Sequence, residues 1–363
     1  MSQPWALQID APSPGGDPAK RLGGLTLALR LALDAQAGGA TAVVCSAEVP
    51  PLLVDARLRL PVVSEAPAGC RVVRVPASLL LHRGLLKALA EHDASASGER
   101  DLVREPFAFE APYGFEPIDV VSRETARRAE RLLFRSLRKP QDGWTSRWLN
   151  RYISLALSRW LVKTPLHPNQ VSVGILAVGL AGAWMASRGD YWSMALGALL
   201  FQAQSVLDGC DGEMSRVSHR GSKTGEWLDT IGDDLTNYGF FAGLSLGLYR
   251  ATAFTPYLVA GAVVVTCGVI VSTLEYRYLI RIGSGDLLKY PLSQGQGTGK
   301  FAAIQPLFKR DTFVFLTLVA CVVGLGGPML CIFAVGAVGI LIGVLQTERR
   351  LWRERRTGQG ATP

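Results

Sequence analysis

Long apolar runs confined to the second half of the chain constrain its fold more than any other feature. A helix needs about 20 mostly apolar residues to cross a bilayer, and the sequence after residue 165 alternates such runs with basic loops. This pattern predicts an all-α, polytopic membrane domain with six transmembrane helices. The predicted helices cover residues 171–187, 191–207, 227–249, 256–274, 312–325 and 328–345.

The loops between these runs carry charges that predict an orientation. Lys and Arg concentrate in cytoplasmic loops. Here they concentrate after the second run, before the fifth run and in the C-terminal tail, whereas the opposite loops carry Arg188 and Arg250. We therefore expect a multi-pass protein of the cytoplasmic membrane, in contact with lipids, with both termini on the cytoplasmic side. The net charge of +8 is assigned to this topology. No nucleic-acid partner is expected, because no DNA- or RNA-binding motif accompanies the charge.

A segment before the first run has the pattern of an amphipathic helix. In residues 144–163, apolar Leu149, Ile153 and Leu157 recur at helical spacing, with arginines between them. Such a helix lies in the membrane interface, where its basic side chains reach the lipid headgroups. The alternative is an ordinary surface helix on the soluble part of the chain.

The first 120 residues have the pattern of a soluble domain. Short β-like runs at 5–9, 41–45 and 71–75 alternate with helical stretches at 25–37 and 79–91. This alternation predicts a small α/β domain over a parallel sheet. The predicted parts of the chain are a soluble α/β domain at 1–120, a basic linker helix at 121–142 and a membrane domain at 143–363.

Four aspartates stand at the edge of the apolar runs. Acids beside membrane-length apolar stretches are costly, and their first interpretation is a functional site. Asp208 and Asp211 are three residues apart, and Asp229 and Asp233 are four apart. Each pair therefore lies on one face of its own helix. Two such helices packed side by side would bring four carboxylates to one point, where divalent cations can neutralise them.

The aspartates belong to a longer motif that resembles the signature of the CDP-alcohol phosphotransferase (CDP-alcohol phosphatidyltransferase) family. That signature has the form Asp-x-x-Asp-Gly-x-x-Ala-Arg, then eight residues, then Gly-x-x-x-Asp-x-x-x-Asp. Ser215 stands where the family usually has alanine, which is a change between two small residues. The matching positions are Asp208, Asp211, Gly212, Arg216, Gly225, Asp229 and Asp233, with residues 217–224 as the spacer.

The resemblance implies an integral-membrane enzyme of phospholipid or inositol phosphate biosynthesis. It would move a substituted phosphate from a CDP-alcohol to an acceptor hydroxyl and release CMP. Two divalent ions are implied, and hard oxygen ligands favour Mg²⁺ or Mn²⁺. Asp233 is the implied general base, and a homodimer is expected. The implied metal ligands are Asp208, Asp211, Asp229 and Asp233, and the implied CDP-binding residues are Asp208, Asp211, Gly212, Ser215, Arg216 and Gly225.

Basic residues outside the motif predict a site for the acceptor. Lys309 and Arg310 precede the fifth apolar run, on the same predicted side of the membrane as the aspartates. Together with Arg277 and Arg281, they are predicted to bind a phosphate group on the acceptor, although positive-inside topology alone also accounts for them. Other polar neighbours are expected outside the site, with His219 at the surface and Glu213, Glu226 and Asp234 solvated or behind the metal ligands.

The position of the α/β domain resembles that of the cytidylyltransferase-like domain fused ahead of some family members, notably inositol-phosphate cytidylyltransferase/di-inositol-phosphate-phosphate synthase enzymes. The junction at residues 138–143 also resembles that group. A nucleotidyltransferase needs a Gly-rich loop that holds triphosphate after its first strand. Residues 10–24 are instead interrupted by proline. We therefore expect a degenerate domain with a structural or regulatory role.

Two other classes of function remain open from the residues. Intramembrane acids also mark the ion pathways of transporters, although transporter sites lie near the midplane and often show internal repeats. A catalytically silent membrane scaffold is the second alternative. Within the enzyme interpretation, the donor is either lipidic CDP-diacylglycerol or soluble CDP-inositol.

Overall fold

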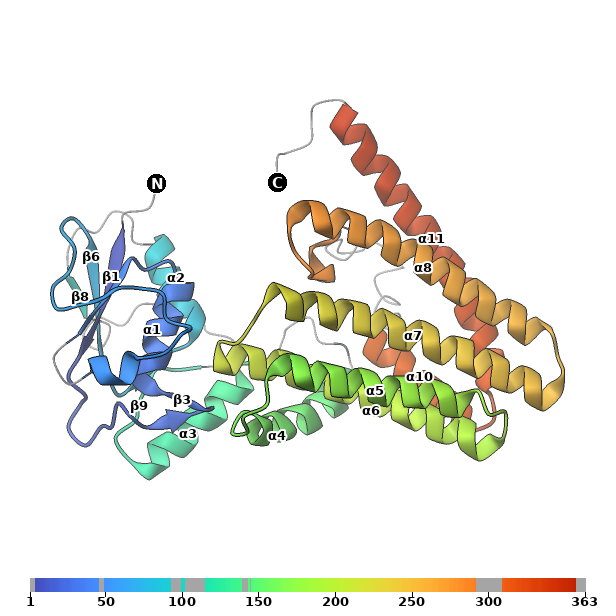
Figure 1. Cartoon of the computed structure of the whole chain (residues 1–363), viewed down its shortest axis with the longest axis horizontal. Helices are drawn as coiled ribbons and strands as arrows, with labels where there is room; N and C mark the ends of the chain where they lie inside the picture. Colours follow the sequence, from blue (N-terminus) through green and yellow to red (C-terminus); the bar gives the residue numbers. More distant parts are fainter. Residues whose placement is uncertain are drawn as a thin grey trace. The chain divides into compact units, whose positions relative to one another are not determined.

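The computed structural model of this chain describes residues 4–45, 49–92, 99–101, 115–138, 143, 145–291 and 309–356. They fall into two compact units (Figure 1). The predicted domain boundaries at residues 120 and 142 stay predictions. Residues 139–142 of the predicted junction and Trp144 of the predicted amphipathic helix lie outside the described residues. The first unit consists of Met1–Pro140, Ser158–Pro165 and Glu213–Arg220, and the second of Gln141–Leu157, Leu166–Gly212 and Gly221–Pro363.

The first unit contains a five-stranded sheet in the order β5-β4-β1-β6-β8. Every pair of neighbouring strands is parallel, which confirms the predicted α/β domain with a parallel sheet. In the central strand, Leu7 is fully buried between Val43 and Val73 of the flanking strands. The strands are β1 (Trp5–Asp10), β4 (Ala42–Cys45), β5 (Val62–Val63), β6 (Arg71–Pro76) and β8 (Glu99–Asp101).

Helices and two short hairpins complete this unit. Both helices predicted here start later than expected, because their first residues form β3 (Leu25–Thr26) and β7 (Leu79–Leu80). The third helix buries Ala129 and Phe134 within the unit, so the predicted linker helix packs on the α/β part. The remaining elements are β2 (Arg21–Leu22), α1 (Leu27–Ala37), η1 (Pro50–Leu53), α2 (Arg83–His92), β9 (Ile118–Asp119) and α3 (Arg123–Arg135).

The second unit is helical, and each of the six predicted membrane runs falls on a helix. Three helices of the described residues are long and apolar enough to cross a membrane: α5, α8 and the Gly326–Glu354 part of α11. α6 and α7 carry acids and α10 has 13 residues, so the number of passes stays a prediction. The helices are α4 (Arg151–Leu161, shared with the first unit), α5 (Pro168–Ala186), α6 (Tyr191–Ser218), α7 (Lys223–Thr252), α8 (Pro256–Ile282), η4 (Leu287–Lys289), α10 (Arg310–Val322) and α11 (Gly326–Arg356).

Glycines allow α5, α6 and α7 to pack with their backbones close together. A Cβ placed on Gly197 of α6 would lie 2.6 Å from the backbone nitrogen of Ala186 on α5. A Cβ on Gly243 or Gly247 of α7 would lie even closer to α5, against the backbones of Ala183 and Ala186. Small residues are the usual means of close helix contact in membranes, where apolar surface gains nothing by association.

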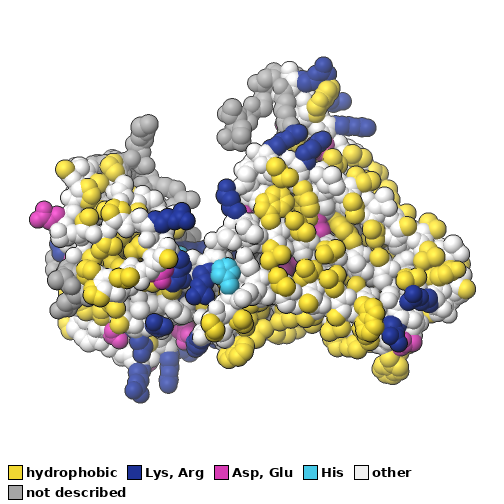
Figure 2. All heavy atoms as spheres, viewed as in Figure 1, with side chains coloured by type: hydrophobic (Ala, Val, Ile, Leu, Met, Phe, Trp, Pro, Cys, Tyr) yellow, Lys and Arg dark blue, Asp and Glu magenta, His cyan; other side chains and the backbone are white. Residues whose placement is uncertain are grey.

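The surface of the helical unit is apolar in a way that suits contact with lipid. Figure 2 shows hydrophobic side chains over much of its visible face. Among them, Val259 on α8 and Val335 on α11 are 59% and 76% exposed. Exposed apolar patches mark contact with a membrane or a partner.

The predicted amphipathic helix is formed by a π-helical turn at Ser146–Asn150 followed by α4. Its exposed face carries Trp148, Tyr152, Ile153 and Trp160. Its inner face mixes polar and apolar residues: Asn150 Oδ1 accepts a hydrogen bond of 3.2 Å from Gln202, and Leu155 is buried. The exposed aromatic and aliphatic side chains fit a helix that lies in a membrane interface. That location stays a prediction.

Candidate active site

Three carboxylates from two helices meet in the second unit. Asp208 lies on α6, and Asp229 and Asp233 lie one turn apart on α7. One oxygen of each lies within 4.8 Å of one oxygen of each of the others. Asp229 is exposed, and the other two are half-buried. The spacing along each helix therefore does bring acids of both helices to one point.

The fourth acid of the motif lies beside this group. Asp211 is 6% exposed and lines the same cavity of about 10 Å³ as the other three aspartates. The hydroxyl of Ser172 on α5 and the backbone nitrogen of Gly212 both donate hydrogen bonds to its carboxylate. Asp211 is therefore held by α5 as well as by its own helix.

The guanidinium of Arg310, on α10, lies among these carboxylates. Nη1 of Arg310 lies 3.1 Å from Oδ2 of Asp208 and 2.8 Å from Oδ2 of Asp233. Its Nη2 donates a hydrogen bond of 2.7 Å to Gln204, and its Nε donates one of 3.4 Å to Asn237. The ion pairs join α10 to α6 and α7 at the aspartates.

The charges of this group favour a divalent cation. Three carboxylates and one guanidinium leave a formal charge of −2. Carboxylate oxygens are the hard ligands that Mg²⁺ and Mn²⁺ prefer. The residues present therefore fit such an ion, and Asp211 adds a further carboxylate in the same cavity.

The motif glycine of α7 lies where a larger side chain has no room. Ser222 caps α7 by accepting a hydrogen bond from the backbone nitrogen of Gly225. A Cβ on Gly225 would lie 3.0 Å from Oδ1 of Asn169 and 3.2 Å from Oγ of Ser222. Close packing against α5 thus accounts for this glycine, whereas its predicted contact with CDP stays a prediction.

The residues predicted to bind the acceptor phosphate are separated. Arg310 lies among the aspartates, and Lys309 directly precedes it at the start of α10. Arg277 and Arg281 line an open cavity of about 500 Å³ between α8 and α11. There Arg277 forms an ion pair of 3.0 Å with Glu348. The acceptor role of all four residues stays a prediction.

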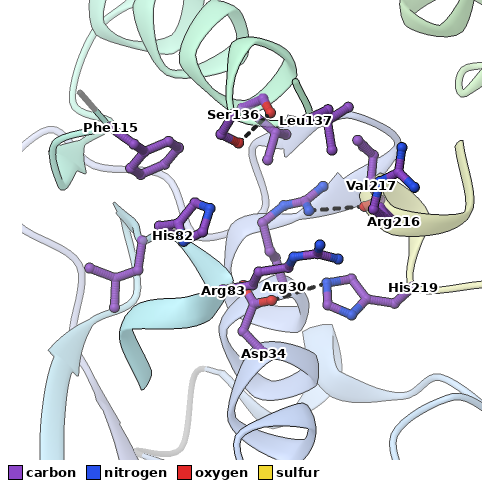
Figure 3. Close-up of a pocket in the computed structure, with 12 residues that line it drawn as sticks. Arg30, Asp34, His82, Arg83, Phe115, Ser136, Leu137, Arg216, Val217 and His219 are labelled. Carbon is purple, nitrogen blue, oxygen red and sulfur yellow. Dashed lines mark hydrogen bonds and ion pairs between the residues drawn. The ribbon is translucent and has the colours of Figure 1, made fainter. Parts of the chain in front are cut away.

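Two predicted CDP-binding residues lie at the end of α6 that belongs to the first unit. Arg216 lines a small cavity of about 30 Å³ in that unit, together with Arg30, His82 and His219 (Figure 3). Burial lowers the pKa of His82 below its usual value, and the nearby Arg83 lowers it further. Ser215 precedes Arg216 and is half-buried. Contacts of Ser215, Arg216 and Gly212 with a nucleotide stay predictions.

One expectation about the neighbouring polar residues is wrong. His219 is not a surface residue, because its side chain is 15% exposed and its Nε2 lies 3.2 Å from Asp34. Glu213 is fully buried and accepts a hydrogen bond of 2.7 Å from Ser158. Asp234 accepts hydrogen bonds from Ser272 and Tyr276 of α8. Tertiary partners reduce the exposure of these residues to water, and the local sequence does not show those partners.

The end of β1 and the loop after it are held by contacts with Arg74 and Ser78. Asp10 forms an ion pair of 2.9 Å with Arg74. The backbone nitrogen of Ser13 donates to the hydroxyl of Ser78, and a Cβ on Gly16 would lie 2.6 Å from the Cβ of Ser78. The described loop is thus packed against Ser78. The degenerate character of the domain stays a prediction.

Sequence reasoning missed three residues of the site. Ser172, Gln204 and Asn237 contact either an aspartate or Arg310. Each is a polar residue within or beside a membrane-length apolar run. Such residues are costly in a bilayer and pair with one another. Their polarity within apolar runs could therefore have identified them.

Comparison with known proteins identifies the helical part of the chain. Residues 165–344 match the family described as CDP-alcohol phosphatidyltransferase. Two curated relatives are named "Bifunctional IPC transferase and DIPP synthase". The one from Aquifex aeolicus is 35% identical over 148 residues, which cover 40% of this chain and 33% of the relative. The one from Archaeoglobus fulgidus is 33% identical over 206 residues, which cover 56% of this chain and 38% of the relative. The matches thus span only about a third of these relatives' length.

Solved structures of phosphatidylinositol phosphate synthase from Mycobacterium tuberculosis are also similar. The structure with CDP-DAG bound is 20% identical, covers 54% of this chain and 93% of that chain, and has a TM-score of 0.42. The structure in complex with manganese and citrate is 20% identical, covers 53% and 87%, and has a TM-score of 0.41.

Proposed function

Because residues 165–344 belong to the CDP-alcohol phosphatidyltransferase family, we propose that the chain transfers a substituted phosphate from a CDP-alcohol to an acceptor hydroxyl and releases CMP. The observation that carries this proposal is the meeting of Asp208, Asp229 and Asp233 within 4.8 Å. The reaction brings a pyrophosphate to this point, and an anion of that charge needs cations in order to bind beside carboxylates.

In this proposal the four motif aspartates hold two divalent ions, Mg²⁺ or Mn²⁺. When bound, such ions neutralise the pyrophosphate and the departing CMP. Asp211 is kept in place for this role by the hydroxyl of Ser172. Asp233 accepts the proton of the acceptor hydroxyl, as a carboxylate in reach of the reacting group can do.

Arg310 contributes the fixed positive charge of the site. Without cations its guanidinium neutralises Asp208 and Asp233 at 3.1 and 2.8 Å. A planar fork of donors also suits phosphate oxygens. We infer that Arg310 both holds Asp208 and Asp233 and binds a phosphate oxygen of the substrate.

The names of the curated relatives favour inositol phosphate chemistry. We propose an inositol phosphate acceptor, with its phosphate held by Lys309 and Arg310 at the start of α10. Arg277 and Arg281 line a separate cavity and are left out of this set. We propose CDP-inositol and CDP-diacylglycerol as the two donors to be compared. The chain would act as a homodimer in the cytoplasmic membrane, with α5, α6, α7, α8, α10 and α11 as its six spans and both termini and the aspartates on the cytoplasmic side.

The experiment that tests this function is CMP release by the purified, detergent-solubilised protein with Mg²⁺ or Mn²⁺. Each donor is offered with inositol phosphate, glycerol phosphate, inositol or serine. Asp233→Asn, on α7, is the variant expected to be inactive. Asp190→Asn is the control: it makes the same substitution just before α6, where Asp190 accepts a hydrogen bond from the backbone nitrogen of Ser193. Release from one donor–acceptor pair that is lost in Asp233→Asn and kept in Asp190→Asn would support the proposal. No release from any pair, together with no binding of metal or CDP, would refute it and favour a transporter or scaffold.

A further inference from the structure

Two long apolar helices of the second unit carry arginines at the same end. α8 and the Gly326–Glu354 part of α11 are long and apolar enough to cross a membrane. Figure 1 shows their C-terminal ends at one end of the helical unit. Arg277 and Arg281 of α8 and Arg349 of α11 line an open cavity of about 500 Å³ there, separate from the cavity lined by the motif aspartates.

This cavity has a positive charge. Its three arginines and the carboxylate of Glu348 give a formal charge of +2. Glu348 is already paired, because its two oxygens lie 3.0 Å from Nη2 of Arg277 and 3.3 Å from the hydroxyl of the buried Tyr290. Within the described part of the chain, no hydrogen bond or ion pair joins the side chain of Arg281 or Arg349 to another group. Two guanidinium groups can therefore bind an anion.

Apolar surface leads from the middle of both helices to these arginines. On α8, Ile270, Leu274 and Arg277 follow one another at intervals of four and three residues, which places them on one helix face. On α11, Leu345 precedes Arg349 by four residues in the same way. Ile270 and Leu345 are 42% and 40% exposed, and the two leucines line the cavity. The cavity is thus apolar on the side of the membrane-length segments and basic at the helix ends.

A tryptophan lies at the basic end of the cavity. Trp352 lines it from α11, is exposed, and has the guanidinium of Arg356 4.4 Å from its ring centroid. Figure 2 shows Lys and Arg side chains gathered at this end of the helical unit, next to hydrophobic ones. Tryptophan and arginine side chains concentrate where the hydrocarbon region of a bilayer meets the headgroups. In a bilayer, the arginines of the cavity would therefore lie at the level of the lipid phosphates.

Topology by itself does not explain this arrangement. The positive-inside rule requires basic residues near the cytoplasmic ends of spans, but it does not require arginines of two helices to line one cavity. The planar fork of an arginine suits phosphate oxygens. Basic pockets between transmembrane helices on the cytoplasmic side bind anionic lipid headgroups. A ligand that matches both halves of the cavity has a phosphate at one end and hydrocarbon at the other.

We propose that the cavity between α8 and α11 is a binding site for an intact anionic phospholipid of the surrounding leaflet. Arg281 and Arg349 bind its phosphate, and its acyl chains lie along Leu274 and Leu345. The lipid is a bound ligand that joins the two helix ends, and it is neither donor nor acceptor in the reaction. The proposal uses the proposed membrane placement of these helix ends, but it does not depend on transfer of phosphate.

The test measures lipid binding to the full-length, detergent-solubilised protein by native mass spectrometry, without divalent ions. The probes are phosphatidylglycerol, phosphatidylcholine with the same acyl chains, and soluble glycerol phosphate. The variant Arg281→Gln/Arg349→Gln is compared with Arg350→Gln/Arg353→Gln, which removes two exposed arginines of α11 that do not line the cavity. All four side chains are exposed, so unchanged melting temperatures are expected and are measured as a check.

We expect the unchanged protein to bind phosphatidylglycerol in preference to phosphatidylcholine. Arg281→Gln/Arg349→Gln should bind phosphatidylglycerol roughly 30-fold more weakly, whereas the control pair should keep its affinity. Arg281→Lys/Arg349→Lys retains both charges and should keep much of the preference.

Three results would overturn the proposal. They are equal binding of the two lipids, an equal loss in both glutamine pairs, and binding of glycerol phosphate as tight as that of the lipid, which would indicate a site for a free phosphate. Because the measurement needs no turnover, failure of the transferase function would leave it valid.

Discussion

Replacing Gly197 by alanine is expected to force α5 and α6 apart. At Gly197 the backbones of α5 and α6 lie close together, and a side chain added there would meet backbone rather than flexible side chains. A Cβ at this position would lie 2.6 Å from the backbone nitrogen of Ala186 and 2.7 Å from the carbonyl oxygen of Gly182. Ordinary contact begins at 3.4 Å, so the new methyl group is 0.8 Å too close to Ala186. Neither backbone atom can move without its helix.

The magnitude follows from two opposing effects. Overpacking of a close contact costs about 1–3 kcal/mol. Alanine in place of glycine within a helix contributes up to about 1 kcal/mol in the other direction. Gly174 on α5 isolates the second effect, because a Cβ there meets no atom within 4 Å. We therefore expect Gly174→Ala to be neutral or stabilising and Gly197→Ala to be less stable by about 1–2 kcal/mol.

The assay is thermal unfolding of both variants and of the unchanged protein in the same detergent. A loss of this size corresponds to a melting temperature roughly 2–8 °C lower for a unit of this length. Since α5 also carries Ser172, which donates to Asp211 of α6, Mn²⁺ binding should weaken in Gly197→Ala as well. Equal melting temperatures for Gly197→Ala and Gly174→Ala would refute the argument from close backbone packing.

Three further outcomes are expected. Ser172→Ala removes the hydroxyl donor to the buried carboxylate of Asp211 and should weaken Mn²⁺ binding about tenfold; an unchanged Mn²⁺ titration would show that this bond does not support the site. Chelation of divalent ions should abolish CMP release, and Mn²⁺ should restore it; release that persists in chelator would contradict a metal-dependent reaction. The side-chain hydrogen bond from Arg57 lowers the pKa of Asp55 to about 2, so the pair stabilises the protein above pH about 4 and this contribution is lost as the pH falls toward 2. Asp55→Asn should therefore unfold more easily than the unchanged protein by about 1 kcal/mol at pH 7, with the difference shrinking in acid, as followed by circular dichroism; a difference independent of pH would exclude this origin.

The sequence was sufficient to predict the features that depend on local spacing. Alternating β-like and helical runs predicted the parallel sheet around β1, because strand and helix periods are properties of short segments. The apolar runs predicted where the helices of the second unit lie. The spacing of Asp208 with Asp211 and of Asp229 with Asp233 predicted that each pair shares a helix face. The match of residues 165–344 to the family agrees with that motif.

Tertiary structure alone decided which distant residues join these elements. Arg310 is about a hundred residues from Asp208 in the sequence, and no local pattern shows that its guanidinium pairs with the aspartates. The same holds for Ser172, whose partner Asp211 lies on another helix. His219 was expected at the surface, but it is half-buried and its Nε2 lies 3.2 Å from Asp34 of α1. Charged and polar groups in a low-dielectric interior are retained where a partner is present, and the partner is set by how the helices pack rather than by the residues beside it in the chain.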